Sequence, residues 1–141
     1  MSGRLLPAIP KRTLDFATLA SGATQEVILA DRVPLLHWRE LTLIVRVHSH
    51  TLLSSANTII ILVYPQSWTS EDPDIQFVTT SAAGGVTLGP ATPSPTILNC
   101  PVATVGYFSI AALARITALA SRQSAGVMQA ALSLEFSSKD A

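Results

Sequence analysis

The sequence predicts an all-β fold, a two-sheet antiparallel β-sandwich, of which the jelly roll is one form. Three observations lead to this prediction. Several segments alternate apolar and polar residues with a period of two, which is typical of half-buried strands. Turn-forming Gly, Pro, Ser and Asp separate these segments, and no segment has the pattern of a strong amphipathic helix. Roughly seven to nine short strands of this kind are typical of a sandwich.

The composition suits one domain with a proper core and a surface that carries few charges. The chain has 141 residues, of which 48% are apolar and 13% are charged, about half the usual charged share. Nine basic and nine acidic residues cancel, which excludes a disordered polyelectrolyte and argues against a nucleic-acid binder that is basic over its whole surface. The single cysteine, Cys100, excludes an intrachain disulfide and a cysteine-rich zinc site.

Residues 1–12 form a distinct segment, which we expect to be an extended basic arm before a single β-sandwich domain at residues 13–141. The segment contains Arg4, Lys11 and Arg12, two prolines and no acidic residue, and prolines at this spacing favour an extended chain over a helix. The rest of the chain has six basic and nine acidic residues, and therefore a net charge of −3. Such an arm is either a frayed tail or a segment that docks on a neighbouring subunit.

Four strands are expected in the first half of the chain. The clearest is at residues 40–50, where Leu43 and Val45 face one side of the strand and Thr42 and Arg46 face the other. The last of the four is almost continuously apolar and β-branched, which indicates a central strand buried on both faces or one whose outer face meets a partner. The strands are expected at residues 13–19, 24–30, 40–50 and 57–64, with a turn at 20–23 and a break at 31–34.

The second half is expected to hold three more strands. The segment at residues 105–119 is ambiguous, because its alanines also suit a helix, but the period of two at Phe108 and Ile110 favours a strand. Four prolines at residues 89–101 indicate an extended crossover. The strands are expected at residues 75–80, 105–119 and 127–137, with a polar loop at 67–74 and turns at Gly84-Gly85 and 121–126.

The apolar composition does not indicate a membrane-spanning helix. The longest charge-free stretch, residues 76–114, is interrupted by glycines and prolines, and the apolar run at residues 59–64 has the length of a strand. The first residues do not resemble a signal peptide. We therefore expect a soluble protein that is made in the cytoplasm.

Two groups of residues could bind a metal ion. His48 and His50 are two residues apart in an expected strand, which would place both imidazoles on one face, but the sequence offers no obvious third ligand. Glu71, Asp72 and Asp74 could supply oxygens to calcium, although they do not follow the EF-hand pattern. The alternatives are a polar or interface pair of histidines and a solvated acidic loop. We predict no metal and no cofactor.

No motif indicates an enzyme. The chain has no G-x-S-x-G and no glycine-rich phosphate loop, and Cys100 is expected to be a buried, inert thiol. Trp38, Tyr64 and Trp68 are the large aromatic residues outside the clearest core pattern. They either cover one end of the core, stack on a sugar or anchor a protein interface.

The strongest expectation concerns the surface. A monomer of this size exposes about 7,000 Å², and 18 charged residues are sparse cover for that area. Apolar or small residues are also expected at outward positions of strands: Ile44, Ile60 or Ile61, and Ala131. We therefore expect other subunits to cover much of the surface. The expected interface residues are Arg4, Leu5, Leu6, Lys11, Arg12, Trp38 and Trp68.

The segments RELTLIVRVHSHTL (39–52), NTIIILVYP (57–65) and VMQAALSLEF (127–136), together with the basic N-terminal segment, resemble the small structural proteins of tailed phages and phage-like particles. The resemblance covers residues 24–137 and rests on overall pattern. It implies a sandwich or jelly-roll subunit of a capsid, neck or tail, located in the particle after synthesis in the host cytoplasm, with copies of itself and a larger shell or tail protein as partners. It implies no catalytic residue.

Two functions follow as hypotheses. The first is a non-enzymatic structural subunit that presents apolar strand faces and extended arms to its neighbours, with nucleic acid at most a minor contact through residues 1–12. The alternative is a carbohydrate-binding or adhesin-like sandwich, in which Trp38, Tyr64 and Trp68 would line a sugar platform.

Overall fold

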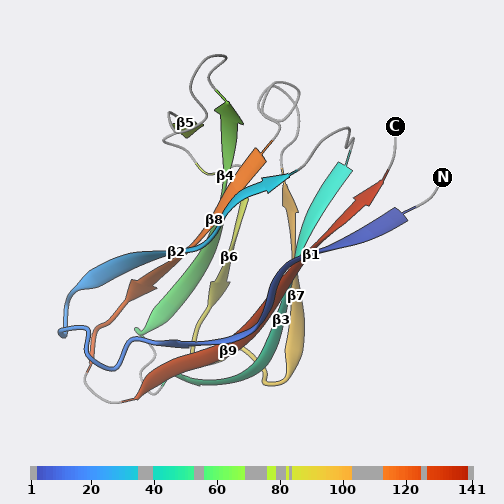
Figure 1. Ribbon diagram of the computed structural model, residues 1–141. Coiled ribbons are helices and arrows are strands. Elements are labelled where there is room, and N and C mark those ends of the chain that lie inside the picture. The colour runs from blue at the N-terminus through green and yellow to red at the C-terminus, as the bar shows by residue number, and fades with distance from the viewer. Residues whose placement is uncertain are drawn as a thin grey trace.

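The computed structural model describes residues 3–34, 40–52, 56–68, 76–78, 82, 84–102, 113–124 and 127–139. These residues form β-strands joined by turns and contain no helix, so the predicted all-β class is confirmed (Figure 1). The strands are β1 (Gly3–Asp15), β2 (Thr24–Pro34), β3 (Glu40–Leu52), β4 (Thr58–Trp68), β5 (Gln76–Val78), β6 (Gly84–Leu88), β7 (Thr96–Val102), β8 (Leu113–Ser121) and β9 (Met128–Lys139).

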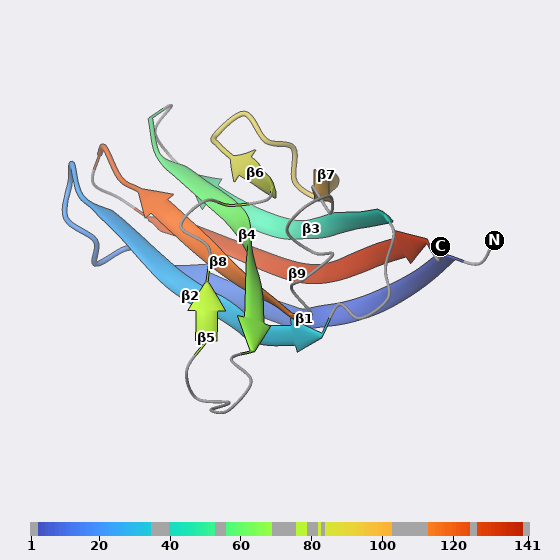
Figure 2. The ribbon, with the colours of Figure 1, turned by 90° about the horizontal axis from the view of Figure 1, so that it is seen from above.

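The strands form two antiparallel sheets that pack face to face (Figure 2). The four-stranded sheet has the order β1-β9-β3-β7, and the five-stranded sheet has the order β2-β8-β4 followed by β6 and β5, which both pair with β4. Successive strands therefore alternate between the sheets over most of the chain. This order is that of a jelly roll in which β6 and β5 together take the place of one strand.

The core lies between the sheets and is filled by the inward residues of the central strands. On the four-stranded sheet, Leu43 of β3 lies opposite Phe136 of β9, and both are fully buried. On the five-stranded sheet, β8 contributes Ile116 and three alanines, and small side chains there let the facing sheet approach closely. The inward residues of β4 and β8 are Ile59, Ile61, Val63, Ala114, Ile116, Ala118 and Ala120.

Asn57 and Arg122 join the loops at one end of the sandwich. The Asn57 side-chain oxygen accepts hydrogen bonds from the backbone N–H groups of Gln123 at 2.8 Å and Ser124 at 3.2 Å. The guanidinium of Arg122 donates to the backbone carbonyls of Phe16 at 2.8 Å and Ser124 at 3.0 Å. Because Asn57 and Arg122 are buried, these bonds satisfy polar groups that would otherwise be costly to bury.

Two sequence-based predictions of local structure are wrong, and the structure makes a third more specific. Residues 31–34 do not break a strand. They are the last four residues of β2, whose pairing with β8 continues to Pro34 across two register shifts. Gly84-Gly85 is the start of β6 and not a turn. The extended segment at 89–101 is a strand from Thr96 onward, paired with β3. The strand favoured for residues 105–119 is confirmed over 113–119, and residues 105–112 lie outside the described residues.

The segment expected to be an arm is, over residues 3–12, the first part of β1. Its backbone pairs with β9 of the same chain, from Gly3 opposite Lys139 onward. Two register shifts, after Pro7 and after Ile9, interrupt this pairing. The segment is thus extended, and it forms an edge strand of the four-stranded sheet.

Candidate interaction surface

The outer side of the five-stranded sheet carries four aliphatic side chains: Ile28, Ile60, Leu62 and Leu119, which we call the aliphatic face. Ile60 of β4 lies opposite Leu119 of β8, and both Leu62 and Ile28 lie opposite Thr117. Ile28 is 50% exposed and the other three side chains are half-buried. The sequence left open whether Ile60 or Ile61 points outward; Ile60 does, while Ile61 is in the core.

A carboxylate lies on this aliphatic face. Glu26 of β2 is opposite Leu119, and its Oε1 accepts a hydrogen bond from the hydroxyl of Thr117 at 2.7 Å and one from the hydroxyl of Tyr64 at 3.3 Å. The pKa of Tyr64 is raised, first because of its burial and then because of the negative charge and hydrogen bond of Glu26. The carboxylate is thus fixed by hydroxyl groups from two neighbouring strands.

Polar contacts also cross the outer side of the four-stranded sheet. Arg46 of β3 forms an ion pair with Glu135 of β9, with Nη2 2.6 Å and Nε 2.8 Å from Oε1. His48 lies 2.9 Å from the hydroxyl of Ser133. Gln129 donates to Asp15 at 2.9 Å. The apolar residues expected to point outward here, Ile44 and Ala131, are half-buried and buried, respectively.

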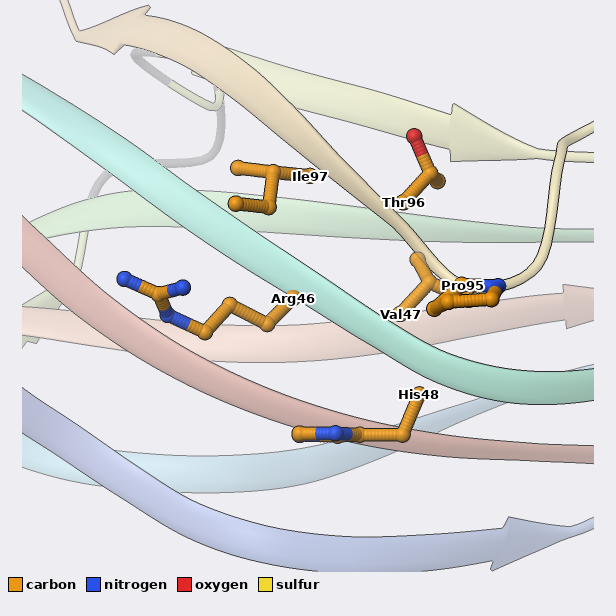
Figure 3. A pocket seen from close by; sticks show the side chains of 6 residues that line it. All are labelled: Arg46, Val47, His48, Pro95, Thr96 and Ile97. Carbon is orange, nitrogen blue, oxygen red and sulfur yellow. The ribbon is translucent and has the colours of Figure 1, made fainter.

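An open pocket of about 490 Å³ lies on this polar side, beside β3 and β7. Figure 3 shows its lining: Arg46, Val47 and His48 from β3, and Pro95, Thr96 and Ile97 at the start of β7. Its two titratable side chains, Arg46 and His48, already have Glu135 and Ser133 as partners. The pocket therefore offers a ligand mainly apolar contacts.

The predicted placement of His48 and His50 on one face is wrong. A register shift after Val47 turns the strand, so that His48 contacts Ser133 on the outer side while His50 lies opposite Ala130, an inward residue of β9. The imidazole Nε2 of His50 instead hydrogen-bonds to the carbonyl of Thr92. No group of three or more potential metal ligands occurs among the described residues. The acidic residues Glu71, Asp72 and Asp74 lie outside them.

Cys100 is buried, as predicted. Its Sγ lies on the inner side of β7, where the thiol donates to the carbonyl of Gly85 at 3.3 Å. Burial raises the pKa of this thiol, so the unreactive protonated form is favoured.

Of the residues predicted to form an interface, those that the structure describes lie in β1 and at the end of β4. The backbones of Arg4, Leu5 and Leu6 pair with Ser138, Ser137 and Phe136 inside the sheet. Within the described part of the chain, the side chains of Lys11 and Arg12 are exposed and form no ion pair. The backbone of Trp68, at the end of β4, pairs with Gln76. Trp38 lies outside the described residues.

The sequence did not point to Glu26 or Thr117. Both positions are ordinary in a strand, and only the register of β2 against β8 brings them together on one face. Of the three aromatic residues of the sugar-binding hypothesis, the structure describes the side chain of Tyr64 alone. Its hydroxyl is already bonded to Glu26, which leaves less of it for a sugar.

No protein-family model matches the chain, and neither a curated protein nor a solved structure matches it. Among the described residues, no helix has the length and hydropathy needed to cross a membrane.

Proposed function

We propose that this chain is a non-enzymatic structural subunit of a large protein assembly, in which the aliphatic face contacts a neighbouring subunit. The observation that carries the proposal is the difference between the two outer sides of the sandwich. Each outer side carries an ion pair and side-chain hydrogen bonds, but the aliphatic side chains are distributed unequally. Among the described residues, the five-stranded sheet gathers Ile28, Ile60, Leu62 and Leu119 on its outer side, whereas the central and edge strands β3 and β7 of the four-stranded sheet contribute Ile44 and Ile97. Contiguous apolar groups on a charge-poor surface are typical of an interaction site.

The edge strands favour contact through a face over contact by strand addition. β1 contains Pro7, Pro10 and two register shifts, and β2 ends at Pro34 after two shifts of its own. β7 contains Pro101, and β6 has only five residues. Prolines, bulges and short strands are the features by which sheet edges resist pairing with another chain.

The assembly we propose is a phage or phage-like particle, with copies of this chain and a larger shell or tail protein as partners. Two arguments support this choice. The sequence resembles small structural proteins of such particles, and the jelly-roll order of the strands is also used by viral capsid subunits. The shared strand order is an analogy of fold. Lys11 and Arg12 could add only a small contact to nucleic acid.

Size-exclusion chromatography with light scattering, over increasing protein concentration, tests the proposal. We expect the mass to rise above that of the 14.9 kDa chain, or the chain to co-sediment with purified particles. A chain that stays monomeric at the highest concentration and does not bind particles contradicts the proposal.

A further inference from the structure

We infer that β1 of one copy, through Lys11 and Arg12, docks on the aliphatic face of a second copy, where Glu26 receives the positive charge. The inference rests on the proposed function and names the partner of its contact surface. It makes the contact head-to-tail, because two different surfaces of the same chain meet.

The aliphatic face carries a carboxylate whose negative charge is not balanced by a cation of the described residues. Glu26 is held by the hydroxyls of Thr117 and Tyr64, and no cation among the described residues forms an ion pair with it. A partner that covered Ile28 and Leu119 would also remove water from this carboxylate. Removing water from an unpaired carboxylate is unfavourable, so a partner that fits this face must bring a cation.

β1 carries the two cations that a second copy can offer to this carboxylate. Among the described side chains, Arg46 is paired with Glu135 and Arg115 with Asp31, while Arg122 is buried. Lys11 and Arg12 are exposed and form no ion pair in this part of the chain. They are adjacent on an edge strand, where a neighbouring molecule can reach them. The chain thus carries two exposed cations on β1 and, on the aliphatic face, a carboxylate that a cation of a second copy can pair with.

The two surfaces belong to different sheets of the sandwich. β1 belongs to the four-stranded sheet, whereas the aliphatic face is the outer side of the five-stranded sheet. No ion pair joins Glu26 to Lys11 or Arg12 within the described chain. When two copies form this contact, one copy keeps an unoccupied aliphatic face and the other keeps an unoccupied β1. Further copies can bind at both places, which gives a ring or an open array.

Charge exchange in the full chain tests the inference. The first variant is Glu26→Lys, and the second is Lys11→Glu with Arg12→Glu. The third variant combines all three changes. A matched control, Gln25→Lys, adds a cation to the preceding, also exposed position of β2, which lies opposite the inward Ala120. Association is measured by sedimentation equilibrium at low and high salt.

We expect each of the first two variants to weaken association by at least about tenfold, as measured for close charge pairs at interfaces. The combined variant restores association to within about threefold of the wild type. In it, the new lysine at position 26 of one copy meets the new glutamates at positions 11 and 12 of the other copy, so the charges are again opposite. Gln25→Lys has little effect, and salt weakens the wild-type contact. Restored association also shows that the chain with Glu26→Lys is folded.

If the wild type associates but the combined variant stays as weak as the single exchanges, the head-to-tail contact is wrong and the proposed function stands. If the exchanges leave association unchanged, the same conclusion follows. If the wild type neither associates nor binds particles, both the contact and the proposed function are wrong.

Discussion

The hydroxyl of Thr117 donates a hydrogen bond of 2.7 Å to Oε1 of Glu26, across the register that joins β8 to β2. Thr117 is almost fully buried, although it lies on the outer side of its sheet. The phenol of Tyr64 reaches the same oxygen from β4. Residues of three strands thereby hold one carboxylate among aliphatic side chains, and the pKa of Tyr64 depends on that carboxylate.

Glu26→Gln should lower the pKa of Tyr64. The substitution removes the negative charge that opposes ionisation of the phenol, but burial remains as the larger cause, so the pKa stays above the ordinary value of 10.0. Ultraviolet titration in a Tyr107→Phe background isolates Tyr64, because the chain has two tyrosines. An unchanged titration curve would show that Glu26 does not act on Tyr64.

Asp15→Ala should destabilise the protein in a pH-dependent way. The backbone N–H of Ala17 and the side chain of Gln129 donate to the Asp15 carboxylate, and these bonds lower its pKa below the ordinary 3.8. The folded state therefore holds the proton more weakly than the unfolded state. The stabilisation is fully present above pH 3.8 and is lost as the pH falls through the lowered pKa. Urea unfolding of both proteins over this range checks it, and a constant difference between them contradicts it.

Asn57→Ala should lower the free energy of unfolding by about 1–3 kcal/mol, since the backbone N–H groups of Gln123 and Ser124 lose their acceptor. Chemical denaturation measures the change. Gln123→Ala is the control, because it keeps the backbone N–H and removes an exposed side chain, with an expected change within about 0.5 kcal/mol. Equal effects of the two substitutions would mean that the Asn57 bonds contribute nothing.

Gly84→Ala should destabilise the fold by about 1–3 kcal/mol through overpacking. A Cβ there would lie 3.0 Å from Sγ of Cys100 and 3.1 Å from the carbonyl oxygen of Pro101. The cost should shrink in a Cys100→Ala background, where the sulfur is absent. Gly89→Ala is the control, because a Cβ at that position meets nothing within 4 Å. Thermal unfolding compares the wild type, the three single variants and the double variant, and a neutral Gly84→Ala contradicts the close approach of β6 to β7.

The fold could be predicted from sequence where alternation was unbroken. Leu43, Val45 and Val47 alternate with outward residues, and all three are buried as the period of two requires. Prediction failed where a register shift exchanges the inward and outward positions along a strand. The register shift after Val47 separates His48 from His50, and a shift of this kind depends on the partner strand β9, which a single segment does not reveal.

The candidate surface could be predicted only in part. A shortage of charge and an outward apolar residue on the strand that ends near Tyr64 were visible in the sequence. The grouping of Ile28, Ile60 and Leu119 was not, because these residues belong to three strands whose order follows from the jelly-roll topology. Lys11 and Arg12 were expected in an arm, yet they lie in a strand of the same chain.

The most direct test of the aliphatic face is a matched pair of substitutions followed by sedimentation equilibrium. Ile28 on this face and Ile97 on the opposite outer side are 50% and 52% exposed, so Ile28→Lys and Ile97→Lys make the same change at equal exposure. We predict that Ile28→Lys weakens association by at least about tenfold, because a charged lysine replaces an apolar side chain that the neighbouring subunit would cover. Ile97→Lys leaves association as in the wild type. Equal weakening by both substitutions, or weakening by Ile97→Lys alone, would contradict the assignment of this face as the contact surface.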